Sequence, residues 1–223
     1  MTDARTRQAL VVRGGWDGHE PVAATDRFIP FLQENGFAVR VSDTLDAYLD
    51  ADAMRATDLV LQIWTMGEIT QEQYEGLANA VLAGTGLAGW HGGVCDSFRG
   101  SPDYLHLTGG QWAAHPGGFV PHQVEVRPDR ADHPLMAGLS PRWSLDTEQY
   151  WVLTDELNDV LATTTFGVHD DSPWREEVTC AAVWTRHWGQ GKVFVSTIGH
   201  KLEDLDHPDV RTLTERGLLW ASR

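Results

Sequence analysis

The regular alternation of short apolar runs with helical patterns over the first ninety residues constrains the fold most. A buried strand is predicted at Gln8 to Arg13, where Gly14-Gly15 ends it, and a helix at Val22 to Asn35, where apolar residues stand at helical spacing before Gly36. The same pattern predicts further strands and helices: strands at 37–41, 58–64 and 87–90, and helices at 44–54 and 70–83. The last helix begins with Thr70 as its cap and Gln73 three residues on, which is a capping box. Such alternation favours a mostly parallel sheet with right-handed crossovers and helices on both faces.

The second half of the chain changes to a β-rich pattern. Strands are predicted at 122–127, 148–153, 160–165, 178–185 and 192–197, with a hairpin turn at 189–191. A closing helix runs from Pro208 to Ala221, with proline in its first turn. Because no repeat and no linker rich in Pro, Ser or Gly divides the chain, we expect one domain over residues 1–223, an α/β fold with an antiparallel β-rich extension.

Charge and apolar run length exclude several classes of partner. The chain carries 17 basic and 32 acidic residues, a net charge of −15, so a nucleic acid and an anionic membrane are both unfavourable partners. Apolar runs such as Leu59 to Trp64 are too short to cross a bilayer, and Met1 to Gln8 holds no apolar signal segment. We therefore expect a cytoplasmic protein with its two cysteines, Cys95 and Cys180, reduced.

Three polar loops follow predicted strand ends, where open α/β sheets bind their ligands. They are Gly14 to Glu20, which contains Asp17 and His19, Trp90 to Phe98, and Ser196 to His200. In the second loop a strand runs into His91 and two glycines follow, a pattern similar to the strand-turn-helix elbow that presents a nucleophile in hydrolases. This elbow holds histidine, and Cys95 lies four residues further on, so we expect Cys95 not to be a nucleophile.

The chain resembles the ThuA-like (trehalose utilization) family over nearly its whole length. The resemblance rests on Gly89 to Pro116 (GWHGGVCDSFRGSPDYLHLTGGQWAAHP), and on DTEQY at 146–150, VLATTTF at 160–166, VWTRHWGQG at 183–191 and STIGH at 196–200. It implies a flavodoxin-like sheet of the class I glutamine amidotransferase type, and a role in carbohydrate metabolism on trehalose-like disaccharides or their keto derivatives.

The resemblance also implies a site. Its expected catalytic residues are His91, Glu148 and His200, and its expected ligands for a divalent metal such as Zn²⁺ or Mn²⁺ are His91, His115 and His200. Substrate contacts are expected from Asp17 at the end of the first strand, from Asp96 and Ser97 at the start of the helix after the elbow, and from Gln111 and Tyr150. His19 is expected only to border the pocket. We predict that His91, His115, Glu148 and His200 converge.

Three functions remain open at this level. The first is an enzyme of the keto-sugar isomerase, lyase or hydrolase kind, which transfers a proton at a carbon next to a carbonyl. The second is a sugar-binding accessory protein without catalysis. The third is an amidotransferase-like hydrolase that uses Cys95, which the placement of His91 disfavours. A small-molecule sugar is the expected partner, and a homo-oligomer is left open.

Overall fold

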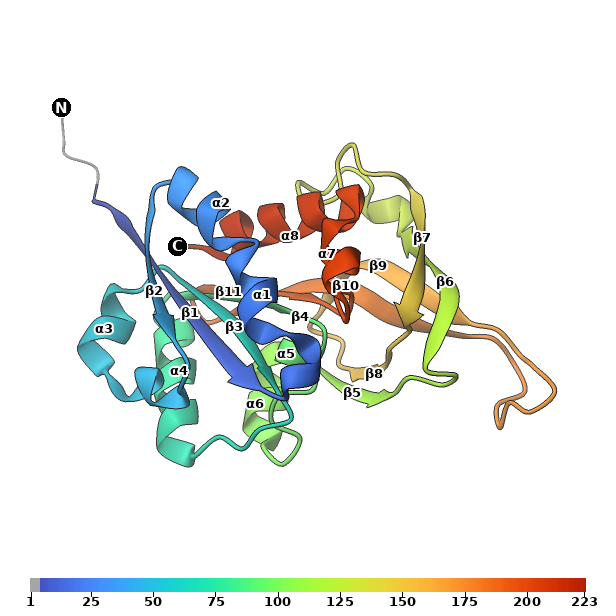
Figure 1. The fold of residues 1–223 in the computed structure, drawn as a ribbon, viewed down its shortest axis with the longest axis horizontal. Coiled ribbons are helices and arrows are strands. Elements are labelled where there is room, and N and C mark those ends of the chain that lie inside the picture. The colour runs from blue at the N-terminus through green and yellow to red at the C-terminus, as the bar shows by residue number, and fades with distance from the viewer. Residues whose placement is uncertain (1–4) are drawn as a thin grey trace.

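The core of the molecule is a nine-stranded sheet, which a computed structural model describes for residues 5–223. The first four residues of the charged N-terminal segment lie outside the described part. The strand order is β2-β1-β3-β4-β11-β10-β9-β6-β7 (Figure 1). The bounds are β1 Arg7–Gly15, β2 Phe37–Ser42, β3 Leu59–Thr65, β4 Gly86–Trp90, β6 Phe119–Val126, β7 Arg142–Glu148, β9 Asp159–Phe166, β10 Val178–Trp188 and β11 Gly191–Ser196.

The sheet is parallel in one part and antiparallel in the other. Strands β2, β1, β3, β4 and β11 pair in parallel, whereas β10, β9, β6 and β7 extend the sheet with antiparallel pairs. The parallel part therefore has five strands, one more than the first-half pattern predicts, because β11 returns to lie beside β4. Its order matches the 2-1-3-4-5 order of flavodoxin-like sheets.

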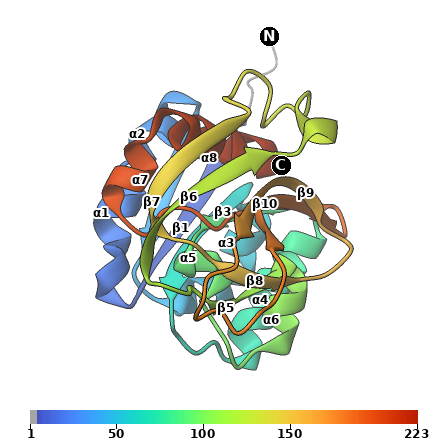
Figure 2. The ribbon, with the colours of Figure 1, turned by 90° about the vertical axis from the view of Figure 1, so that its right-hand side faces the viewer.

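Helices cover both faces of the parallel part, as predicted. On one face lie α1 (Pro21–Asp26), α2 (Ile29–Glu34), α7 (Leu202–Asp206) and α8 (Pro208–Ala221); on the other lie α3 (Ala51–Ala56), α4 (Gln71–Leu82) and α6 (Pro102–Thr108) (Figures 1 and 2). A hydrophobic core lies on each face of the sheet, and the alternating side chains of β1 contribute to both. Ala9 and Val11 face the α1–α2–α8 side, whereas Leu10 and Val12 face the α3–α4 side. No described helix is long and apolar enough to cross a membrane.

Some predicted helices are confirmed and others are divided. Helix α4 begins with the predicted capping box of Thr70 and Gln73, and α8 has the predicted bounds. The single helix predicted from Val22 to Asn35 is wrong: α1 ends at Asp26 and α2 begins at Ile29. Proline at position 30 lacks an N–H and suits a helix start, which explains the new beginning. The predicted helix at 44–54 is a 3-10 segment, Leu45–Leu49, followed by α3.

The single strand predicted at 148–153 is also divided. Glu148 ends β7, and Trp151 begins β8 (Trp151–Thr154), which pairs with β5 (Gly110–Ala114) in a separate two-stranded sheet. Neither β5 nor the bulk of β7 was predicted. The break at 149–150 leaves Glu148 at the end of the antiparallel extension, from which it reaches the carboxyl ends of the parallel strands.

Candidate functional site

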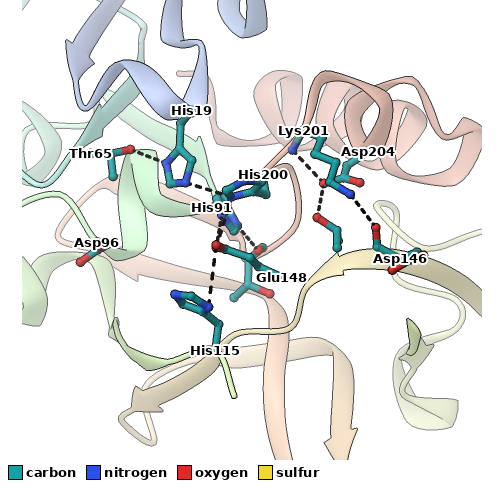
Figure 3. Close-up of polar contacts among 12 residues, drawn as sticks. His19, Thr65, His91, Asp96, His115, Asp146, Glu148, His200, Lys201 and Asp204 are labelled. Carbon is teal, nitrogen blue, oxygen red and sulfur yellow. Dashed lines mark hydrogen bonds and ion pairs between the residues drawn. The ribbon is translucent and has the colours of Figure 1, made fainter. Parts of the chain in front are cut away.

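Three histidines and one glutamate converge beyond the strand ends (Figure 3). His19, His91, Glu148 and His200 each offer one ligand atom, and these four atoms lie within 4.8 Å of one another. His200 Nδ1 is 3.1 Å from His19 Nε2 and 3.3 Å from His91 Nε2. Glu148 Oε2 is 3.2 Å from His91 Nε2 and 3.2 Å from His200 Nδ1. We call these four residues the histidine cluster.

His19 is brought to the cluster by the loop after β1. The Trp16 N–H donates to the Thr65 carbonyl over 2.9 Å, which ties the loop to the end of β3, and the 3-10 turn Asp17–His19 follows. The loop packs closely on the elbow, since a Cβ at Gly92 would lie 2.5 Å from His19 Cε1. Only glycine at position 92 therefore allows the His19 ring to lie where it does.

His91 occupies a backbone conformation that side chains rarely adopt. Its φ is 49° and its ψ is −141°, between the end of β4 and the short helix α5 (Gly92–Cys95). The His91 N–H donates to the Ser196 carbonyl over 2.7 Å, and the His91 carbonyl accepts from the Cys95 N–H over 2.9 Å. Such strain in a buried residue persists only where its surroundings enforce it, and it is concentrated at functional sites.

Hydrogen bonds orient two of the imidazole rings. His91 Nδ1 lies 2.8 Å from the carbonyl oxygen of Thr197. Because a carbonyl can only accept, the proton is on Nδ1 and the Nε2 lone pair faces the cluster. His19 Nδ1 lies 2.9 Å from Thr65 Oγ1, which holds that ring with its Nε2 toward His200. Bonds of this kind orient histidines that ligate metals.

The electrostatics favour neutral imidazoles around an ionised carboxylate. Burial, followed by the charges of His91 and His200, lowers the pKa of His19 to about 3. Burial also lowers the pKa of His91, and it outweighs the attraction of the nearby Glu148 carboxylate, which raises that pKa. Burial opposes ionisation of Glu148, but the adjacent His200 and His91 rings outweigh it and hold the pKa of Glu148 below its ordinary value. At neutral pH His19 and His91 thus present lone pairs beside the negative charge of Glu148, as a cation requires.

The spacing of the four ligand atoms fits one divalent metal. With Zn–N bonds of about 2.0–2.1 Å, neighbouring ligands of a tetrahedral ion lie about 3.4 Å apart. Four of the six separations run from 3.1 to 3.3 Å, close to that value. The other two, from His19 to His91 and from His19 to Glu148, are within 4.8 Å. Three imidazoles and one carboxylate form a donor set that suits Zn²⁺ or Mn²⁺.

The structure brings His91, Glu148 and His200 together and places His115 at the side. His115 Nδ1 is 3.8 Å from Glu148 Oε1, and the His115 side chain is 37 % exposed. It lies outside the four-group set, in which His19 stands instead. Tyr150 is buried and stacks on His91, with ring centroids 4.0 Å apart, so it supports the ring from behind.

The other expected substrate contacts lie elsewhere. Asp96 follows the end of α5 and opens no helix, and it lies apart from the cluster (Figure 3). Its buried carboxylate pairs with Arg99. Ser97 has no exposed surface and donates to the Gly93 carbonyl, which leaves it no contact with a substrate. Gln111 lies in β5 and lines a separate cavity of about 250 Å³. Asp17 is exposed on the loop that carries His19.

His19 is the cluster residue that sequence reasoning underrated. Its loop leaves β1 at the same edge as the loops after β4 and β11, and that position is the signal that could have found it. Nothing in the local sequence shows that the 3-10 turn aims this side chain inward and leaves Asp17 outside.

Cys95 faces the core and not the cluster. Its side chain is buried among the residues on the α3–α4 side of the sheet, and burial raises the pKa of its thiol well above the ordinary value. A thiol that stays protonated is a poor nucleophile.

Two exposed aromatic side chains border the cluster. Trp16 is 46 % exposed and packs edge-on against His19, with centroids 4.8 Å apart. Phe119 is 53 % exposed, and its ring centroid lies 4.9 Å from that of His200. Lys201 Nζ lies 4.3 Å from the Phe119 ring centroid. Exposed aromatic faces beside a polar cluster suit a ligand with both apolar and hydroxylated surfaces.

Solved structures of low sequence identity share this fold. A ThuA-like protein from Bacteroides uniformis aligns with a TM-score of 0.73 and 18% identity, over 100% of this chain and 91% of that one. A ThuA-like protein from Parabacteroides merdae aligns with a TM-score of 0.75 and 15% identity, over 97% of this chain and 90% of that one. A cytoplasmic protein from Salmonella typhimurium aligns with a TM-score of 0.66 and 12% identity, over 97% of this chain and 100% of that one. No curated protein sequence matches the chain.

The sequence profile of one family covers almost the whole chain. The profile of the ThuA family, described as trehalose utilisation, matches residues 8–221, which include all four members of the histidine cluster. With the ThuA-like proteins among its structural neighbours, this match shows that the chain belongs to the ThuA (trehalose utilisation) family.

Proposed function

We propose that this protein is an enzyme of carbohydrate utilisation that acts on a trehalose-like disaccharide or its keto derivative, by proton transfer at a carbon next to a carbonyl. The observation that carries the proposal is the histidine cluster, in which three imidazoles and a carboxylate share one centre at the carboxyl edge of the sheet. Membership of a family described as trehalose utilisation supports the substrate class.

The chain's residues divide into two roles under this proposal. His19, His91, Glu148 and His200 would hold a divalent metal, with Thr197 and Thr65 fixing two of the rings. A bound divalent metal would supply Lewis acidity toward a carbonyl oxygen. His115 is the imidazole beside the cluster that no ligand position uses, so we assign it the transfer of the proton.

Electrostatics around His115 support this assignment. Its Nδ1 lies near Glu148 Oε1, and that carboxylate would stabilise the imidazolium once His115 has taken a proton. The side chain is also partly exposed, which lets it exchange that proton with water. Trp16 and Phe119 would hold the apolar face of a sugar ring above the cluster.

The test is proton exchange at the carbon next to a ketone. Untagged protein loaded with Zn²⁺ or Mn²⁺ is incubated with a keto derivative of trehalose in D₂O, and loss of the neighbouring C–H signal is followed by NMR. We expect exchange with the wild type and a loss of roughly 100-fold or more in His115→Ala, the range typical of a general base. Cys95→Ser is the matched control and should keep most of the rate.

A sugar-binding protein without catalysis is the second candidate, and the exposed Trp16 and Phe119 favour it. It predicts saturable binding of the same compound with no exchange at any metal loading. Exchange that is lost in Cys95→Ser and kept in His115→Ala would instead revive the amidotransferase-like alternative.

A further inference from the structure

A cavity of about 740 Å³ lies beside the histidine cluster, in the antiparallel half. Three segments line it: residues 113–122, which connect β5 to β6 and begin β6, the stretch from Gln149 to Trp151, and the end of β9 with the hairpin that follows, up to Trp174. Figure 1 shows this hairpin between β9 and β10 projecting from the body of the molecule. Ligand cavities in proteins typically measure about 300–1,000 Å³.

The cavity has a fixed aromatic wall. The Trp151 ring centroid lies 5.0 Å from that of Phe166 and 5.1 Å from that of Trp174. The Trp174 Nε1–H donates to the Gly167 carbonyl over 2.9 Å, which holds the indole of the hairpin in place. Both tryptophans stay partly exposed while they line the cavity. Rigid aromatic surface of this kind binds apolar faces at little entropic cost.

Uncharged polar groups and one carboxylate line the rest of the cavity. The His122 Nδ1–H donates to the Val120 carbonyl over 2.9 Å, which orients the ring and leaves Nε2 as an acceptor. Thr165 and Ser172 add hydroxyl groups, and Asp171 adds a carboxylate. No lysine or arginine is among the lining residues, so the cavity does not match a phosphate or carboxylate ligand. Apolar faces together with hydroxyl partners match a neutral sugar ring.

The cavity and the cluster share one boundary. Ala114 and Pro116 line the cavity on either side of His115, and Gln149 lines it between Glu148 and Tyr150. The neighbouring side chains of His115 and Glu148 therefore lie next to residues that line the cavity. A disaccharide with one ring at the cluster would have to extend its second ring past this pair of side chains.

We infer that this cavity binds the second, unreacted ring of a disaccharide whose first ring lies at the histidine cluster. The inference rests on the proposed function for its substrate class. It predicts a preference for disaccharides over monosaccharides through Trp151 and Trp174, residues that take no part in the cluster.

The test compares two variants that change the cavity in opposite ways. Trp174→Ala removes part of the aromatic wall. Ala113→Trp fills the cavity from an exposed position in β5, where tryptophan is well tolerated in a strand. Trehalose and glucose are titrated by calorimetry and by saturation-transfer NMR, and Zn²⁺ is titrated separately. Leu157→Ala, at an exposed residue that does not line the cavity, is the control.

We expect both cavity variants to weaken trehalose binding by roughly tenfold or more, and Trp174→Phe to recover most of it. Glucose and Zn²⁺ binding should stay unchanged. Equal trehalose affinity in all variants would overturn the cavity assignment while the exchange reaction stands. Trehalose binding that depends on Trp174 without any exchange would support the cavity and refute the proposed reaction. Loss of self-association in Trp174→Ala, with no effect on sugar binding, would make the cavity an interface between copies and overturn the assignment.

Discussion

His91 combines a strained backbone with a fully buried imidazole whose proton position is set by a main-chain carbonyl. In the cluster, His200 Nδ1 lies within hydrogen-bonding distance of both His91 Nε2 and His19 Nε2. Three imidazoles so close cannot all be protonated, because their charges would repel in a site largely closed to water. The arrangement therefore suits a bound cation better than three imidazolium ions.

Acidification should destabilise the metal-free protein through His19. The folded-state pKa of His19 is about 3, below its ordinary value of 6.5, so the unfolded chain takes up a proton that the folded chain refuses. This contribution is fully present above pH 6.5 and is lost as the pH falls from 6.5 toward 3. The loss amounts to about 1.4 kcal/mol per pH unit for one proton.

Urea unfolding of protein treated with a chelator, measured across that pH range, checks this expectation. His19→Gln should flatten the dependence, since glutamine does not titrate. His187→Gln, at an exposed histidine far along β10, is the control and should leave the slope unchanged. An equal slope in His19→Gln and the wild type would show that His19 does not carry the effect.

At the scale of elements, the sequence predicts the helix starts that depend on interactions between residues close in the chain. The capping box at Thr70 and the proline start of α8 are satisfied within a few residues, so the sequence identifies them. The break between β7 and β8 depends on pairing with β6 on one side and β5 on the other, which are long-range contacts. Sequence periodicity carries no information on such partners, and one continuous strand was predicted there.

The elbow is the element on which the site depends most. Gly92→Ala would place a Cβ 2.5 Å from His19 Cε1 and 2.9 Å from Thr65 Cγ2, so the His19 ring must move. We expect metal affinity to fall at least tenfold, with a stability cost of about 1–3 kcal/mol from overpacking. Gly100→Ala is the control, because a Cβ there meets nothing within 4 Å.

Zn²⁺ titration and thermal unfolding of both variants test the close approach at Gly92. Unchanged affinity in Gly92→Ala would mean that the His19 ring is not needed in its observed place. A similar loss in Gly100→Ala would mean that the effect is not specific to the elbow.

In the whole molecule, the parallel and the antiparallel parts of the sheet both contribute residues to the histidine cluster. Loops after β1, β4 and β11 of the parallel half supply His19, His91 and His200, whereas the antiparallel extension supplies Glu148. The strand-end rule predicted His91 and His200 from the sequence, and the family pattern added Glu148. The expectations for Asp96, Ser97 and Gln111 also came from the family pattern, but these side chains turn toward Arg99, the core and a separate cavity. The direction of a side chain in a loop depends on packing that spacing does not reveal.

The metal content of untagged protein, purified without added metal and measured by elemental analysis, decides whether the histidine cluster is a metal site. We predict about one Zn²⁺ or Mn²⁺ per chain in the wild type and in His115→Ala, and almost none in His19→Ala or His91→Ala with the fold intact by circular dichroism. This pattern follows because His19 and His91 lie within the four-group set and His115 lies outside it. If the wild type held no divalent metal, even after equilibration with Zn²⁺ and Mn²⁺, the histidine cluster would not be a metal site. A metal that is lost in His115→Ala and kept in His19→Ala would contradict the assignment of the ligands.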